Sequence, residues 1–256
     1  MSAHQLFRST SNRVSAVLMM AVVLLLASFS ALAQDWSTYD ELLAQYVTPA
    51  ERQGVTHHRV NYQALRQDPR YPQLLALVEN QPIAAMTTRN ERLAFYINAY
   101  NIYAIKMVID HLPLESIRDA GSFFSPVWKK SVGTIGGKVV TLDEIEHAIL
   151  RTMGEPRIHF AIVCASLSCP DLRLEAFRAD RLDQQLEEQT RGFLNDSSKG
   201  LALNGTSARV SQIFDWFADD FAAVGGVEAF VRRYRDLPAT LSLRANLPYN
   251  WSLNGE

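Results

Sequence analysis

Two cysteines and a histidine lie close together between Arg157 and Pro170. Cys164 and Cys169 are the only cysteines of the chain, and His159 precedes them on the same segment. A thiolate held beside a histidine can act as a nucleophile, because the histidine accepts the thiol proton. Two cysteines of an exported protein, however, more often form a disulfide. The segment therefore predicts either a nucleophilic thiol or a disulfide. An oxidising compartment outside the cytoplasm would favour the disulfide.

The stretch that ends at Cys164 predicts a buried β-strand, because apolar residues alternate along it. Ile158, Phe160 and Ile162 share one face with Cys164, whereas His159 lies on the other face. After Cys164 the strand would break into a small polar loop. A rigid strand end holds a nucleophile better than a loop does, so Cys164 is the expected nucleophile if the thiols are free.

Residues 89–111 predict a long helix, which Thr88 and Glu91 would open with a capping box. Asn98 and Asn101 fall within its apolar half, on adjacent turns. A buried amide without partners costs about 1–3 kcal/mol, so both amides should be hydrogen-bonded. Either they tie a neighbouring loop or strand to the helix, or one of them lines a pocket and orients a histidine or a substrate carbonyl. Physical chemistry alone favours the structural role.

A second amphipathic helix is predicted over residues 142–153, and it carries a carboxylate on its apolar face. Glu146 falls within the apolar arc, whereas His147 lies toward one edge of the polar side. A carboxylate on a core face must find a cation or several donors, or become protonated. We expect Arg157 or His159 to be its partner. Glu146 therefore belongs either to a structural ion pair or to a site.

These residues supply the groups that cysteine catalysis requires. Cys164 would be the nucleophile, His147 or His159 the base, and Glu146 or Asn98 the group that orients the histidine. This set predicts a thiol-dependent hydrolase or acyl transferase that acts on a peptide or amide of the cell envelope. The alternative is a non-enzymatic binding or interaction protein of the envelope, in which the two cysteines form a structural disulfide.

Several motifs resemble those of the family known as domain of unknown function 547. They are the aromatic-x-Asn-x-x-Asn helix within residues 93–101, the Gly-Gly turn and Ile-Glu-His-x-Ile-Leu-Arg helix within 135–151, the strand and cysteine loop within 159–170, and the C-terminal pieces 213–216 and 247–254. One departure is Val163, where many relatives are expected to have an asparagine before the cysteine. The family name implies no activity. The resemblance does imply that the motif set includes Asn98, Asn101, Glu146, His147, Arg151, His159, Cys164 and Cys169.

The N-terminus is typical of a secretory signal peptide. Arg8 and Arg13 form a basic region, residues 14–26 are almost wholly apolar, and Ala33 ends a small-residue cleavage pattern. The apolar run is shorter than the roughly 20 residues that a membrane-spanning helix needs. We therefore expect cleavage after Ala33, a mature chain that starts at Gln34, and a periplasmic or secreted product.

The remaining residues, 34–256, suit a single domain, because the chain is 48% hydrophobic and can bury a sizeable core. The interleaved strands and helices show no regular βαβ alternation. An α+β fold is therefore expected, with helices packed on a small, largely antiparallel sheet. A net charge of −2 gives no reason to expect nucleic acid as a partner. No cofactor, metal site or membrane span after processing is expected, and the partner would be a small-molecule or peptide substrate.

Overall fold

The computed structural model describes residues 34–122, 124–205 and 207–256, and Trp36–Glu256 forms one compact unit. The signal peptide and its cleavage site after Ala33 lie outside the described residues, so both stay predictions. Among the helices that are described, none has the length and apolar character that crossing a bilayer requires.

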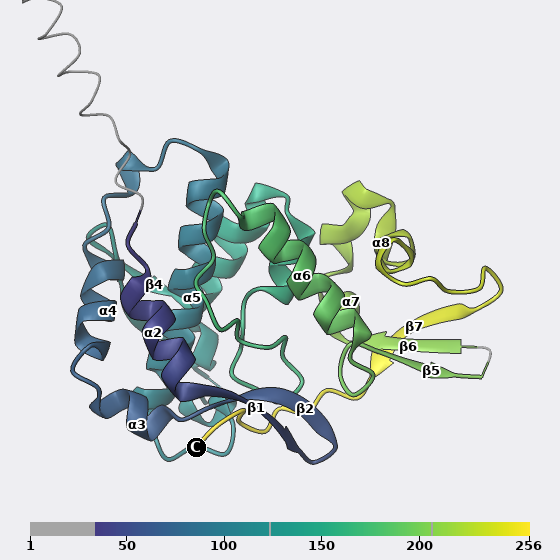
Figure 1. Ribbon diagram of the computed structural model, residues 1–256, viewed down its shortest axis with the longest axis horizontal. Helices are drawn as coiled ribbons and strands as arrows, with labels where there is room; N and C mark the ends of the chain where they lie inside the picture. The colour runs from purple at the N-terminus through teal and green to yellow at the C-terminus, as the bar shows by residue number, and fades with distance from the viewer. Residues whose placement is uncertain (1–33, 123, 206) are drawn as a thin grey trace, which may run out of the picture. The chain divides into compact units, whose positions relative to one another are not determined.

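Helices make up most of the regular structure in this unit (Figure 1). The α-helices of the described residues are α2 (Ser37–Tyr46), α3 (Tyr62–Gln67), α4 (Tyr71–Glu79), α5 (Arg89–His111), α6 (Leu182–Asn195), α7 (Ile213–Trp216) and α8 (Gly226–Tyr234). A π-helix, η4, covers Glu144–Leu150. Short 3-10 helices are η1 (Ile83–Ala85), η2 (Ile117–Ala120), η3 (Val127–Lys129), η5 (Arg151–Met153), η6 (Pro156–Phe160) and η7 (Ala218–Val224).

The strands form three small sheets, in which most neighbours are antiparallel. Two are hairpins, β1 (Val47–Arg52) with β2 (Val55–Val60), and β3 (Ser131–Ile135) with β4 (Lys138–Thr141). The third joins β5 (Leu201–Asn204), β6 (Ser207–Ser211) and β7 (Ser242–Leu247), with β7 parallel to β6. A single domain that mixes helices with small, mostly antiparallel sheets confirms the predicted α+β class.

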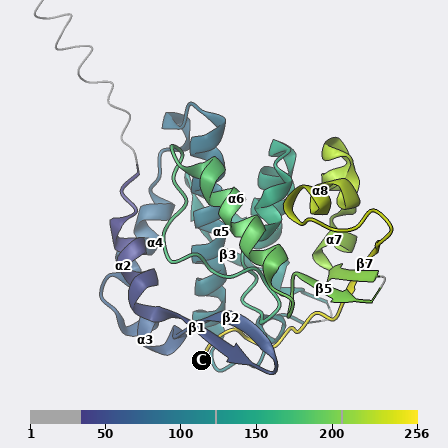
Figure 2. The same ribbon diagram turned by 45° about the vertical axis from the view of Figure 1, so that its right-hand side comes forward.

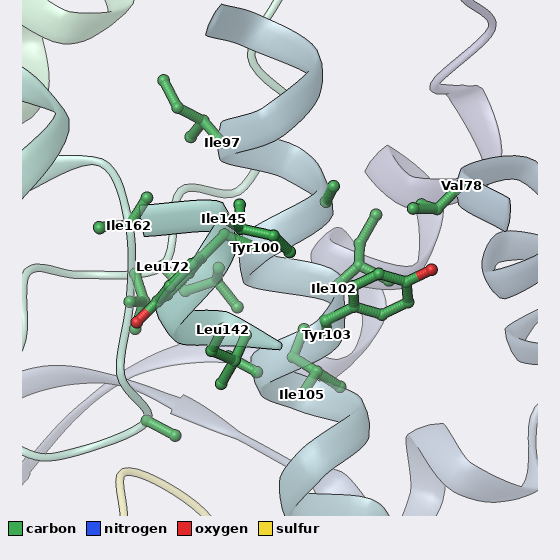
Figure 3. Close-up of a cluster of buried hydrophobic side chains, with 14 of the residues drawn as sticks. Val78, Ile97, Tyr100, Ile102, Tyr103, Ile105, Leu142, Ile145, Ile162 and Leu172 are labelled. Carbon is green, nitrogen blue, oxygen red and sulfur yellow. The ribbon is translucent and has the colours of Figure 1, made fainter. Parts of the chain in front are cut away.

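The long helix α5 runs through the main core and begins with the predicted capping box of Thr88 and Glu91. Figure 3 shows that its side chains pack on several elements at once: Tyr103 extends toward Val78 of α4, whereas Tyr100 extends toward Ile162. Because α5 is buried along most of its length, shortening one of its core side chains to alanine should cost about 2–5 kcal/mol.

A second hydrophobic core lies among α7, α8 and the sheet of β5, β6 and β7. Figures 1 and 2 show these elements at one end of the unit, with α2, α3 and α4 at the other. The chain ends beside the first hairpin, where the backbone N–H of Val60 donates to the carbonyl of Asn254 at 3.1 Å. Tyr249 packs against both cores, so the C-terminal segment joins them.

The predicted strand before Cys164 is wrong. Pro156–Phe160 is a 3-10 helix whose first turn is capped by the Glu155 carboxylate, which accepts from the Arg157 N–H at 3.2 Å. The segment is buried on all sides, with Ile158, Phe160, Ala161 and Val163 all at 4% exposure or less. A short run that is apolar all round has the same sequence pattern in a buried strand and in a buried helical turn.

The second predicted helix does form, but its central turns are wound as a π-helix. The N–H of Arg151 donates to the carbonyl of Glu146, one residue further back than in an α-helix. This wider turn changes which side chains share a face, so positions assigned at 100° per residue drift along the helix. π-Helical turns occur frequently at functional sites, and this one carries Glu146 and His147.

Candidate active site or binding pocket

A pocket of about 250 Å³ brings most of the predicted site residues together. Its walls come from α5, η3, η4, η6, the cysteine loop, α7 and the C-terminal segment. It lies where residues of the two cores meet, and its lining includes Tyr100, Trp128, Asp143, Glu146, His147, His159, Cys164, Cys169, Trp216, Phe217, Tyr249 and Trp251.

The two cysteines of the pocket form a disulfide, Cys164–Cys169, with an S–S distance of 2.07 Å. The paired alternative is therefore confirmed, and neither cysteine is a free thiol. In this state Cys164 cannot attack a substrate, so the catalytic role expected for it stays a prediction. The hydroxyl of Tyr249 lies 3.2 Å from Cys164 Sγ and 3.1 Å from Cys169 Sγ.

Glu146 reaches the pocket from the π-helix. The hydroxyl of Tyr100 donates to Glu146 Oε2 at 3.2 Å. Burial raises the pKa of Glu146 to about 7, although the Tyr100 hydrogen bond and the charge of Arg151 oppose this rise. The expectation of Arg157 or His159 as partner is wrong, because Tyr100 supplies the hydrogen bond and Arg151 the nearby charge. At neutral pH the carboxyl is therefore close to half protonated and can both donate and accept.

A charged network links the two histidines of the pocket. His159 Nε2 lies 2.7 Å from Asp220 Oδ2, and Arg151 donates to the same carboxylate at 2.6 and 2.8 Å. Arg151 Nη1 also donates to His147 Nδ1 at 2.8 Å, so this nitrogen carries no proton. Burial lowers the pKa of His159 to about 4, which keeps the ring neutral at pH 7 and makes Nε2–H the donor to Asp220. The ring stacks on Phe217 at 4.1 Å.

The two amides of α5 lie behind the pocket and bind backbone. Asn98 donates to the Phe177 carbonyl at 2.8 Å and accepts from its N–H at 2.9 Å. Asn101 donates to the Ala161 carbonyl at 2.9 Å and accepts from the Val163 N–H at 2.8 Å. Neither amide is among the residues that line the pocket. Asn101 therefore holds the segment that leads into Cys164, while Asn98 holds a different segment.

Three important residues of the pocket and its charged network were not among those predicted from the sequence. Asp220 joins His159 to Arg151, yet it lies 61 positions after His159 and no local pattern connects them. Tyr249 belongs to the C-terminal motif at residues 247–254, so the resemblance did hold a signal for it. Tyr100 lies between the two asparagines of α5, where an aromatic residue looks like core.

The comparisons with known proteins agree with the motifs. The family model described as "Protein of unknown function, DUF547" matches residues 83–194, and this range holds all eight residues of the predicted motif set. A search of curated proteins and a search of solved structures each found no match. The C-terminal pieces at 213–216 and 247–254 lie beyond the matched residues, and their assignment to the family pattern stays a prediction. Over residues 83–194, the chain is therefore similar to the DUF547 family.

Proposed function

We propose that the protein is a binding protein of the cell envelope whose disulfide pocket receives an amide-containing small molecule or peptide. The observation that carries this proposal is the lining of the pocket. Three of the four tryptophans of the chain, Trp128, Trp216 and Trp251, line it together with Tyr249 and a protonatable carboxyl. Apolar, aromatic walls with a few convergent polar groups are typical of ligand sites.

Glu146 gives the pocket its preference for an amide. An amide presents one donor and one acceptor, and a carboxyl whose pKa is about 7 can serve either of them at neutral pH. The histidines offer less, because His159 Nε2 and His147 Nδ1 are already bonded to Asp220 and Arg151. The network therefore fixes the shape of the wall, and Glu146 supplies the adaptable contact.

A wider cavity of about 1230 Å³ continues from the pocket, because Trp128, Tyr249 and Trp251 line both. Its wall carries polar side chains, among them Arg118, whose guanidinium lies 5.2 Å from the centre of the Trp251 ring. A ligand longer than the inner pocket can therefore extend over Trp251 into this cavity. An elongated molecule with a peptide portion fits this arrangement better than a compact metabolite.

The test uses intrinsic tryptophan fluorescence, because the fourth tryptophan, Trp36, is buried at 4% exposure outside the pocket. The probe is muramyl dipeptide, a peptidoglycan fragment that contains amides. We expect a saturable change in emission, and Glu146→Ala should weaken binding about tenfold because a hydrogen bond in a desolvated site is lost. The control Glu144→Ala changes an exposed carboxylate of the same helix. No emission change, or equal affinity of the two variants, would contradict the proposal.

A second candidate is the thiol-dependent hydrolase or acyl transferase. It is favoured by the contact of His159 with Asp220, since a carboxylate that orients a histidine is the arrangement of catalytic triads. The enzyme would be active only after the disulfide is opened. Release of amine from a peptide amide after mild reduction, and its loss in Cys164→Ser, would support this candidate; no release from the reduced protein would dismiss it.

Export is part of the proposal and rests on the N-terminal pattern that ends at Ala33. We expect the mature protein to start at Gln34 and to be recovered in the periplasmic or secreted fraction. Cell fractionation followed by intact-mass analysis measures the location and the first residue. Recovery of a chain that still starts near Met1 in the membrane fraction would contradict processing.

A further inference from the structure

The two sulfurs of the disulfide have unequal surroundings. Both cysteines line the pocket, but Cys169 is 2% exposed, whereas Cys164 is partly exposed. The backbone N–H of Cys164 donates to Cys169 Sγ at 3.0 Å. Cys164 is therefore the more accessible cysteine for a molecule that enters the pocket, whereas the sulfur of the more buried Cys169 has a fixed backbone donor.

Two hydroxyl groups lie close to both sulfurs. Ser166 Oγ lies 3.3 Å and Tyr249 Oη 3.1 Å from Cys169 Sγ. Burial raises the pKa of Tyr249, so its hydroxyl keeps its proton and can donate. The same hydroxyls also lie within 3.3 Å of Cys164 Sγ, but within the described part of the chain no backbone N–H donates to that sulfur. Three donors therefore converge on Cys169 when the hydroxyls turn toward it.

This donor set suits a sulfur that becomes charged. A disulfide sulfur is only a weak acceptor, so an intact cross-link gains little from three donors. A thiolate is an anion, and hydrogen bonds to charged groups are about twice as strong as neutral ones. Donors around a departing sulfur lower its pKa as a thiol, and a leaving group of lower pKa departs faster.

We propose that Cys164–Cys169 is an exchangeable disulfide, opened by a thiol that enters the pocket, attacks Cys164 and releases Cys169. The electron pair of the incoming thiolate forms a bond to Cys164 Sγ. The S–S bond breaks, and its electron pair leaves on Cys169 Sγ, where the three donors receive it. The proton of the incoming thiol goes to solvent.

A second thiolate completes the reaction by attacking the sulfur of the bound thiol. Cys164 then leaves as a thiolate, and the two entering thiols are joined as a disulfide. Two thiols are thus oxidised and the cysteine pair is reduced by two electrons. This thiol oxidation goes beyond ligand binding and does not rest on it.

The C-terminal segment places the key hydroxyl. The backbone N–H of Leu167 donates to the Ser252 carbonyl at 2.9 Å, and the N–H of Asn250 donates to Ser168 Oγ at 2.9 Å. These bonds tie the cysteine loop to the segment that carries Tyr249. Tyr249 is therefore a positioning residue for the leaving sulfur, and its effect should be on the rate of exchange.

The first experiment uses the wild-type protein in its oxidised, native form. The probe is reduced glutathione, the reaction is stopped with N-ethylmaleimide, and the labelled cysteines are mapped by mass spectrometry. We expect glutathione on Cys164 and maleimide on Cys169. No reaction without denaturant, or glutathione on Cys169 instead, would overturn the proposal.

The second experiment measures how fast dithiothreitol reduces the native protein. Loss of one donor removes a hydrogen bond that stabilises the leaving thiolate, which should slow exchange roughly three- to tenfold. Tyr249→Phe and Ser166→Ala should both show this loss. The control Tyr46→Phe removes a tyrosine hydroxyl that donates to Asp68, outside the pocket. Equal rates in all folded variants would overturn the role of the donors, and either variant alone suffices if the other fails to fold.

Discussion

The amides of α5 and the charged groups of the pocket are both polar clusters within apolar surroundings. They differ in how many of their hydrogen-bond donors and acceptors already have a partner. Asn98 and Asn101 each donate to a backbone carbonyl and accept from a backbone N–H. Among the described residues, Glu146 has one hydrogen-bond partner, Tyr100, and it faces a cavity. The amides therefore contribute stability, whereas Glu146 keeps hydrogen-bonding capacity for a ligand.

The largest expected effect is the loss of stability when an amide of α5 is removed. Asn101→Ala would leave the Ala161 carbonyl and the Val163 N–H buried without their partner. Each unsatisfied group costs about 1–3 kcal/mol, so the free energy of unfolding should fall by about 4 kcal/mol. Urea denaturation measures this loss. The control Asn90→Ala, an exposed position on the same helix, should change it by less than about 0.5 kcal/mol. Similar midpoints for the two variants would contradict the amide's structural role.

The next largest effect is the contribution of Glu146 in the pocket to stability, which depends on pH. Burial raises the pKa of Glu146 from 4.5 to about 7, so the folded protein holds this proton more tightly than the unfolded chain does. The resulting stabilisation is fully present below pH 4.5, declines as the pH rises, and is lost above pH 7. Relative to Glu146→Gln, which does not titrate, the wild type should lose about 3 kcal/mol between pH 4.5 and pH 8.

Thermal or urea unfolding across this pH range measures the difference between the two proteins. Comparing the variant with the wild type at each pH cancels the other titrating groups, including His159, whose lowered pKa acts in the opposite direction. Glu144→Gln is the matched control, because it keeps the capping contact with Thr141 on the exposed side of the helix. A constant difference between wild type and Glu146→Gln at every pH would show that Glu146 is not buried.

The sequence predicted the elements whose signals are local. The helix α5 begins and ends where the capping box and the apolar periodicity placed it, because both signals act within a few residues. The Gly-Gly turn of the resemblance is likewise local: it joins β3 to β4, and Gly136 and Gly137 adopt the positive φ angles that such a turn requires.

The parts that the sequence did not predict depend on tertiary contacts. Apolar alternation could not distinguish a strand from the 3-10 turn at Pro156–Phe160, because that segment is buried on every side. A period of 3.6 residues does not describe the π-turn that carries Glu146. The pairing of His159 with Asp220 joins distant positions, so only the folded chain reveals it. The choice between a disulfide and free thiols likewise needed the structure.

A smaller loss of stability is expected when the Cys164–Cys169 disulfide is removed, and its size tests whether the disulfide acts only as a cross-link. The loop that it closes is short, so loss of the bond should reduce stability by about 2 kcal/mol. Cys164→Ser and Cys169→Ser should therefore lower the urea midpoint by similar amounts, since each removes the same bond. Wild type held under reductant is the control and should match both. A much larger loss in Cys169→Ser would show that its buried sulfur contributes packing beyond the cross-link.

The smallest expected change in stability comes from the rim of the pocket. His147 is exposed, and its ring accepts a hydrogen bond from Arg151 and lies 3.8 Å from Asp143 Oδ1. The two bonds from Arg151 to Asp220 do not depend on it. His147→Gln should therefore change the free energy of unfolding by about 0.5 kcal/mol or less, because exposed contacts of charged groups contribute little. Its affinity for muramyl dipeptide should fall, since the ring lines the pocket. If His147→Gln instead destabilises the protein as much as Asn101→Ala does, the pocket network is a closed structural set like the amides, and the distinction between the two clusters fails.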